Sequence, residues 1–169
     1  MKKLLLALIS VLILSGCASS SQVNSEFSPT DIAFAEMMIP HHEQAIEMSE
    51  LALMNSTNPE VLELAQEIKS AQAPEIELMA SWSGVKSSTH AGHMMDGMLS
   101  EDELNELREA KGADFDALFL KGMIKHHEGA IEMAQDVLAS ENKVVADLGS
   151  SIIAAQKSEI AKMKELLLK

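Results

Sequence analysis

Two stretches of the sequence place adjacent histidines beside methionines, a donor set that suits a soft metal ion. M-I-P-H-H-E-Q-A-I-E-M runs from Met38 to Met48, and M-I-K-H-H-E-G-A-I-E-M runs from Met123 to Met133, 85 residues later. Imidazole and thioether donors together suit copper, and thioether in particular selects Cu(I) over hard cations. We therefore expect copper, as Cu(I) in preference to Cu(II), and no organic cofactor.

Helical geometry places both histidines of the first repeat beside an apolar face. Successive residues are rotated by about 100°, so with Met38 at the centre of that face His41 lies about 60° to one side and His42 about 40° to the other. Met48 points in nearly the same direction as His41, and neighbours three or four residues apart can converge on one ion. The ligands expected from the two repeats are Met38, His41, His42, Met48, Met123, His126, His127 and Met133.

A second repeat lies downstream of each histidine motif. Q-A-P-E-I-E-L-M runs from Gln72 to Met79, and Q-K-S-E-I-A-K-M runs from Gln156 to Met163, 84 residues later. Their Gln and Glu residues interrupt an apolar stripe, and a buried polar group needs a partner. The nearest available partner is the histidine pair on the facing helix, which the Gln and Glu side chains could contact directly or through an ion. In a metal site these side chains would fix the imidazole tautomer. We expect Met79 and Met163 as further ligands, with Gln72, Glu75, Gln156 and Glu159 supporting the histidines.

The segment H-A-G-H-M-M-D-G-M between the two halves is a second candidate metal site. Its donors are His90, His93, Met94, Met95 and Met98, and its glycines would let the backbone wrap around an ion. The alternative is a flexible connector, because the region from 83 to 99 is rich in Gly, Ser, His and Met.

Simple packing is the alternative for the methionines and histidines of the repeats. Methionine is a common core filler, and a lone histidine at a helix interface is more often a satisfied core residue than a ligand. Two adjacent histidines in both repeats favour the metal site, since burying four imidazoles without a partner costs stability. A di-iron site is disfavoured, because the Glu-x-x-His motif of such bundles is absent.

Helix start and stop signals predict four long helices and one short helix. The long ones are expected from Ser28 to about Met54, from Asn58 to near Trp82, from Asp114 to Ala139 and from Asn142 to Leu168. A capping box at Ser100–Glu103 predicts the short helix, which should stop near Gly112. Each half is a helical hairpin that cannot bury its apolar face alone. The predicted fold class is all-α: a four-helix bundle of two duplicated hairpins, with a short extra helix in the central connection.

The first residues have the composition of a secretion signal. Two lysines precede an apolar run from Leu4 to Leu14, which is too short for the ~20 residues of a membrane-spanning helix. The run ends in L-S-G-C, which resembles the lipobox of bacterial lipoproteins and implies lipidation of Cys17, the sole cysteine. The alternative is an ordinary signal peptide with a free thiol. We expect a signal peptide over 1–16, a lipidated cysteine and tether over 17–27, and the domain over 28–169.

Charge and cysteine content exclude several classes of function. The net charge is −13, and the expected signal peptide contains lysines but no acidic residue. Such a surface repels nucleic acid and anionic lipid headgroups and favours cations. After lipidation no thiol would remain for a disulfide, a nucleophile or a thiolate metal site. The expected partners are a metal ion and the membrane, the latter through the lipid anchor only.

At the two histidine motifs and both Q-x-x-E-I-x-x-M motifs the chain resembles a family of bacterial envelope proteins. That family is known as a domain of unknown function, is ferritin-like in fold and has copper-binding CopM-like members. The resemblance spans about Ser28 to Leu168 and implies a helical bundle, Met and His metal ligands and a role in copper handling. Pro40 replaces Lys125 of the second repeat, so we expect a loosened or kinked first helix and unequal affinities in the two repeats.

These features predict a lipid-anchored envelope protein that buffers, sequesters or delivers copper, with a copper-handling envelope protein as partner and no catalytic residues. It would face the periplasm or the exterior, and Ala18 after the lipidated cysteine favours the outer membrane where one exists. The alternatives are a di-metal or copper-dependent oxidase of ferritin-like fold and a metal-free envelope interaction module.

Overall fold

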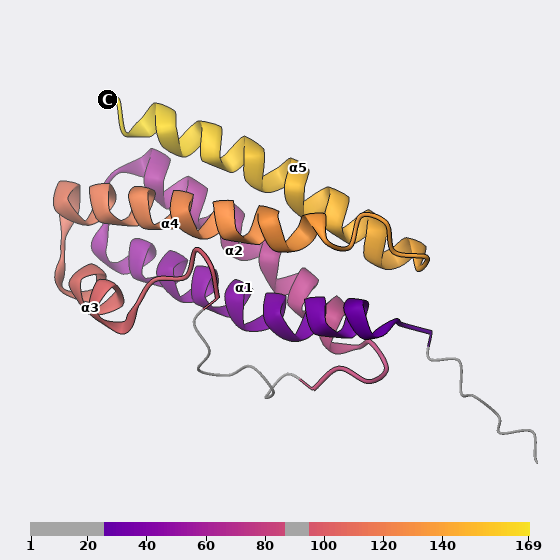
Figure 1. Cartoon of the computed structure of the whole chain (residues 1–169). Coiled ribbons are helices and arrows are strands. Elements are labelled where there is room, and N and C mark those ends of the chain that lie inside the picture. The colour runs from indigo at the N-terminus through magenta and orange to yellow at the C-terminus, as the bar shows by residue number, and fades with distance from the viewer. Residues whose placement is uncertain (1–25, 87–94) are drawn as a thin grey trace, which may run out of the picture.

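The computed structural model describes residues 26–86 and 95–169. Its helices are α1 (Pro29–Asn55), α2 (Pro59–Ala80), α3 (Glu101–Glu109), α4 (Gly112–Gln135) and α5 (Lys143–Leu166). The described residues contain no strand. Four long helices, with a short one in the central connection, confirm the predicted all-α four-helix bundle (Figure 1).

Side-chain caps explain where most of the helices begin. At α1 the Ser28 hydroxyl accepts from the Asp31 N–H at 3.1 Å, and the Asp31 carboxylate accepts from the Ser28 N–H at 2.8 Å. Ser100 and Glu103 form the same capping box at α3. Asn58 and Asn142 cap α2 and α5 through their side-chain oxygens. These caps satisfy N–H groups that have no partner inside the helix, so the predicted starts of these four helices are confirmed to within a residue. α4 starts at Gly112, two residues before the predicted Asp114, without a side-chain cap.

Two predicted helix ends were wrong by a few residues. α4 ends at Gln135, because residues 136–139 form tight turns in which N–H groups bond three residues back, as Val137 does to Ala134. Gly112 opens α4 with φ +57° and does not close α3, which ends at Glu109. α2 ends at Ala80, near Trp82 as predicted.

Pro40 lies inside α1, which stays one helix from Pro29 to Asn55. The ring removes the N–H that would bond to the Glu36 carbonyl, so one internal backbone hydrogen bond is lost at this turn. The predicted loosening is therefore limited to one hydrogen bond in an unbroken helix.

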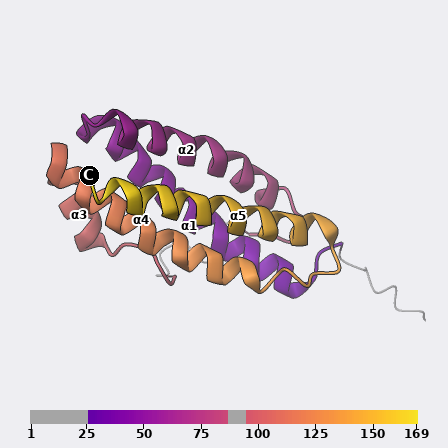
Figure 2. The same ribbon diagram turned by 90° about the horizontal axis from the view of Figure 1, so that it is seen from above.

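The four long helices form two hairpins that pack on each other. α1 packs against α2, α4 packs against α5, and the hairpins meet mainly through α1 and α4. α3 lies against the ends of α1 and α4 (Figure 1, Figure 2). Within the described part of the chain, no helix is long and apolar enough to span a bilayer.

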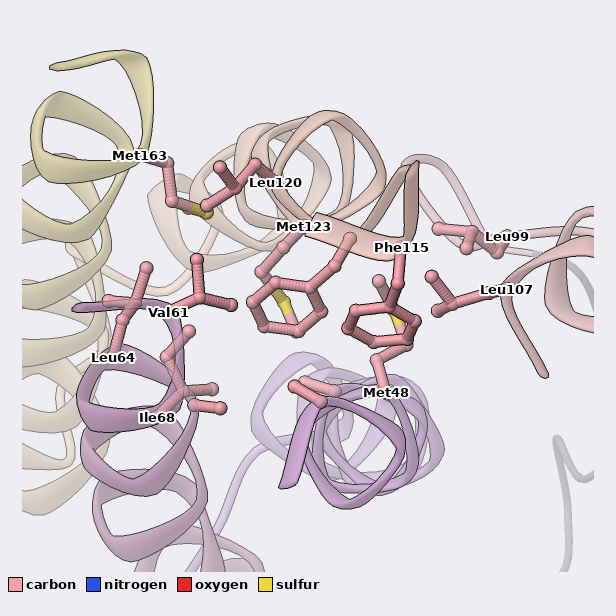
Figure 3. Close-up of a cluster of buried hydrophobic side chains, with 14 of the residues drawn as sticks. Met48, Val61, Leu64, Ile68, Leu99, Leu107, Phe115, Leu120, Met123 and Met163 are labelled. Carbon is pink, nitrogen blue, oxygen red and sulfur yellow. The ribbon is translucent and has the colours of Figure 1, made fainter. Parts of the chain in front are cut away.

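The apolar core is split into two clusters. The Phe115 cluster includes Met48, Leu64, Phe115, Met123 and Met163 (Figure 3). The Trp82 cluster includes Phe27, Phe34, Met38, Met79 and Trp82.

A polar layer separates these clusters on every long helix. On α1, His41 and His42 stand between Met38 of the Trp82 cluster and Ala45 of the Phe115 cluster. The corresponding buried polar positions on α2, α4 and α5 are Gln72, the pair His126 and His127, and Gln156. We call these residues, together with Glu75 and Glu159, the histidine layer.

Phe27 packs into the helical body. Its ring stacks on Trp82 with centroids 4.9 Å apart and is 7% exposed. The Glu26 carbonyl accepts a hydrogen bond from the Asn142 side chain at 3.0 Å. The packed body therefore starts before Ser28, because a large aromatic ring buries more apolar area than a polar tether can offer.

Candidate metal site

The four histidines of the repeats are completely buried in the histidine layer, each with 0% exposure. The rings of His41 on α1 and His126 on α4 lie with their centroids 3.8 Å apart and their planes at 40°. Equivalent residues of the two repeats therefore meet at the contact between the hairpins. The two histidine motifs therefore lie in one buried layer and not in two separate places.

Each hairpin also holds one histidine against a carboxylate of its second helix. His42 Nε2 lies 2.8 Å from Glu75 Oε2, and His127 Nε2 lies 2.6 Å from Glu159 Oε2. An ionised carboxylate can only accept, so Nε2 carries the hydrogen in both pairs. The Nδ1 atoms of both rings are buried and have no hydrogen-bond partner among the described residues.

Other polar atoms of the layer are also without partners. Leaving a buried donor or acceptor unsatisfied costs about 1–3 kcal/mol, so a group of such atoms in a native core needs an explanation. Within the described residues the unpartnered atoms of the layer are His41 Nδ1, His42 Nδ1, His126 Nδ1 and Nε2, His127 Nδ1, both polar atoms of the Gln72 amide, and Gln156 Oε1. Imidazole lone pairs in this number fit a bound cation.

Burial keeps two of the imidazoles neutral. Desolvation, followed by the charge of His42, lowers the pKa of His41 to about 3, and the Asp96 carbonyl opposes this only in part. Desolvation, followed by the charge of His41, lowers the pKa of His126 well below its ordinary value. Both rings therefore keep a lone pair at neutral pH, which metal ligation requires.

The methionines of the repeats lie on both sides of the layer. Met38 and Met79 are buried in the Trp82 cluster, and half-buried Met133 packs against it. Met48, Met123 and Met163 are buried in the Phe115 cluster, where Figure 3 shows their sulfurs among apolar side chains. Each side thus carries three thioethers, and their ligand role remains a prediction beside their evident packing role.

The donors are gathered but do not converge. In the described part of the chain, no three His, Cys, Asp or Glu side chains form a group that could hold a metal ion as they stand. His41 and His126 lie against each other, so one of them must turn before they share an ion.

The second candidate site is only partly described. Met95 and Met98 are half-buried in the loop that leads to α3. His90, His93 and Met94 lie outside the described residues, as does Cys17.

Two contacts of this loop with the site were not predicted. The Asp96 carbonyl oxygen lies 3.3 Å from His41 Nε2. The Gln44 side chain donates to the Leu99 carbonyl at 3.0 Å and accepts from the Leu99 N–H at 2.8 Å. The sequence held one signal for them: the histidine motifs differ at Gln44 and Gly129, which are equivalent positions.

The bundle and its buried layer define a four-helix domain with a candidate metal site between its hairpins. The chain belongs to DUF305, a domain of unknown function whose sequence profile matches residues 31–167. This confirms the resemblance to a domain-of-unknown-function family. No curated protein matches the chain.

Several solved structures are similar to the chain. A DUF305 protein from Streptomyces coelicolor is 30% identical, with a TM-score of 0.76 over 82% of this chain and 92% of that one. A DUF305 fragment from Deinococcus radiodurans is 29% identical, with a TM-score of 0.73 over 83% and 96%. CopM in its Cu(II)-bound form is 35% identical, with a TM-score of 0.71 over 82% and 95%. CopM structures with Cu(I) and with silver are also similar.

Proposed function

We propose that this protein binds copper in the histidine layer and buffers, sequesters or delivers it. The observation that carries the proposal is a layer of four buried imidazoles, each with a buried Nδ1 that has no partner among the described residues. Copper- and silver-bound CopM, at 32–35% identity, supports it.

The donor chemistry favours Cu(I). The neutral imidazoles of His41 and His126 supply nitrogen donors, and Met38 and Met123 stand one helical turn before them. Thioether donors select Cu(I), and Ag(I), also monovalent and soft, suits the same donors. In this proposal Glu75 and Glu159 orient His42 and His127 and supply negative charge at the edge of the layer.

The site would operate outside the cytoplasm. The leader-like residues and the lipobox-like L-S-G-C, which lie outside the described residues, support secretion and anchoring through Cys17. The domain would then meet copper in the cell envelope while held to a membrane by its lipid. An envelope protein that receives the copper would be its partner.

Competition with a chromogenic Cu(I) chelator tests the proposal. The double substitution His41→Leu and His126→Leu keeps the volume of the core and removes both rings of the contact between the hairpins. We expect copper affinity to fall by about 100-fold or more, because loss of a supporting partner alone costs about 10–100-fold. His90→Ala with His93→Ala is the matched pair from the linker and should retain tight binding. Equal affinity in the wild-type chain and the His41/His126 variant would refute the proposed site.

A further inference from the structure

Residues Met95–Leu99, which we call the strap, lie between α1 and α4 beside the histidine layer (Figure 1). They lead from the central connection into α3 and touch both of the helices that carry histidine pairs. Neither the fold nor the proposed ligand set explains why a loop backbone is held at this place.

On α4 the strap packs backbone against backbone. A Cβ at Gly129 would overlap the Asp96 carbonyl oxygen and lie 2.6 Å from its carbon. Gly97 has φ +86°, and a Cβ there would lie 2.7 Å from the Lys125 carbonyl and 3.0 Å from the His126 carbonyl. Only glycine permits both this conformation and this approach. The strap therefore rests directly on the turn of α4 that carries His126.

On α1 the strap is held by hydrogen bonds. Gln44 satisfies both the N–H and the carbonyl of Leu99. The Asp96 carbonyl lies 3.3 Å from His41 Nε2, and a carbonyl oxygen can only accept, so this ring nitrogen carries a hydrogen.

The internal repeat explains how one strap fits two similar helices. Gln44 and Gly129 occupy the same position of the histidine motif, 85 residues apart. At this position α1 needs a side chain long enough to reach the Leu99 backbone, whereas α4 needs no side chain at all. Of the two differences between the histidine motifs, the one after the histidine pair is therefore what seats the strap.

The strap also accounts for a difference between the histidines. Three of the four rings have Nε2 against an oxygen acceptor: His42 and His127 against carboxylates, and His41 against the Asp96 carbonyl. Each of the three leaves Nδ1 buried and unpartnered in the described structure. The strap contacts His126 through backbone only, and neither nitrogen of His126 has a hydrogen bond of good geometry there. The His41 backbone opposes the lowering of the His126 pKa only in part.

We propose that the strap is a wall of the histidine site, in which the Asp96 carbonyl positions His41 so that its Nδ1 meets the ion. The statement that His41 Nδ1 meets an ion rests on the proposed function. With the strap seated, His41 and His126 are fully buried, and the Asp96 carbonyl holds His41 but not His126. An ion entering or leaving from this side must displace the strap.

The substitution Gly129→Ala tests the proposal, because it removes the seat of the strap and favours the helix that carries it. Gly149→Ala is the matched control. Its Cβ would crowd the Val137 side chain at 2.9 Å and the Ala134 carbonyl at 3.0 Å, and neither residue belongs to the strap or the histidine layer. Gly97→Ala disrupts the same contact from the side of the strap and should reproduce the result of Gly129→Ala. Circular dichroism checks that all three variants keep their helices.

Two measurements on the full chain decide the outcome. In metal-free protein, long-range proton–nitrogen NMR of labelled histidines should show hydrogen on Nε2 of His41 in the wild type and Gly149→Ala. In Gly129→Ala this preference should be lost for His41 but kept for His42 and His127. With Ag(I) as the probe, release to a competing thiol should be about tenfold faster in Gly129→Ala.

An unchanged His41 tautomer and an unchanged release rate in Gly129→Ala would overturn the proposal. A different result is possible, in which the wild-type chain binds no Ag(I) but the Nε2–H of His41 is present in the wild type and lost in Gly129→Ala. That result would uphold the positioning role of Asp96 and refute the proposed copper function. The two failures are thus distinguishable.

Discussion

Acidifying the metal-free protein from pH 6.5 to pH 5 is expected to lower its free energy of unfolding. Each histidine that stays neutral in the folded state should contribute about 1.4 kcal/mol per pH unit. His41, with its pKa lowered to about 3, and His126, shifted in the same direction, are two such groups. Because both pKa values are lowered by burial, the unfolded chain binds more protons than the folded one below pH 6.5. Stability is therefore fully present above that pH and is lost as the pH falls toward 3, where His41 alone would cost about 5 kcal/mol.

Chemical denaturation at a series of pH values measures this slope. The range above pH 5 is the cleanest, since most carboxylates titrate below it. The variant His41→Leu with His126→Leu is the matched control, because it removes both groups and fills their volume. It should be less sensitive to acid between pH 6.5 and pH 5. It should also be at least as stable at pH 7, since three buried ring nitrogens without partners, Nδ1 of His41 and both nitrogens of His126, have left the core. The same slope in both proteins would mean that these rings are protonated in the folded state.

Saturating copper is expected to raise the melting temperature by about 10 °C. A ligand that binds only the folded state at about 1,000 times its dissociation constant stabilises it by about 4 kcal/mol. For a domain of about 150 residues each kcal/mol shifts the midpoint by about 2–4 °C. Copper would also supply partners for ring nitrogens that are buried and have no hydrogen-bond partner among the described residues.

Calorimetry with Cu(I) under reducing, oxygen-free conditions measures this shift. The His41/His126 leucine variant, which keeps the methionines and the acidic surface, should respond by only a small fraction of the wild-type value. A wild-type midpoint that does not move with copper would instead favour a metal-free interaction module whose histidines serve packing.

Much of the fold could be predicted from the sequence because its signals are local. Ser28 with Asp31 and Ser100 with Glu103 bond within one turn, so these helix starts depend on a few neighbouring residues. Helix ends were harder to predict. The chain leaves α4 at Gln135 although the residues after it are compatible with a helix, and buried Val137 lies in the turn that follows. Tertiary packing decides such ends.

The candidate site was partly predictable for the same reason. Helical rotation places His41 and His42 beside the apolar face. Glu75 and Glu159 occupy equivalent positions of the second repeat, which indicated the carboxylates that contact the histidines. The Asp96 carbonyl was not predictable, since a backbone atom leaves no residue-type signal in the sequence.

By itself, the sequence determined that this chain forms two similar helical hairpins with inward histidines, because periodicity and capping act over a few residues. Only the tertiary structure decided that the hairpins meet at His41 and His126, so that two motifs make one layer. The rotation of one hairpin against the other, and the seat of the strap on Gly129, depend on contacts between residues far apart in the chain. Such contacts are fixed by the packing of whole helices, which no local pattern encodes.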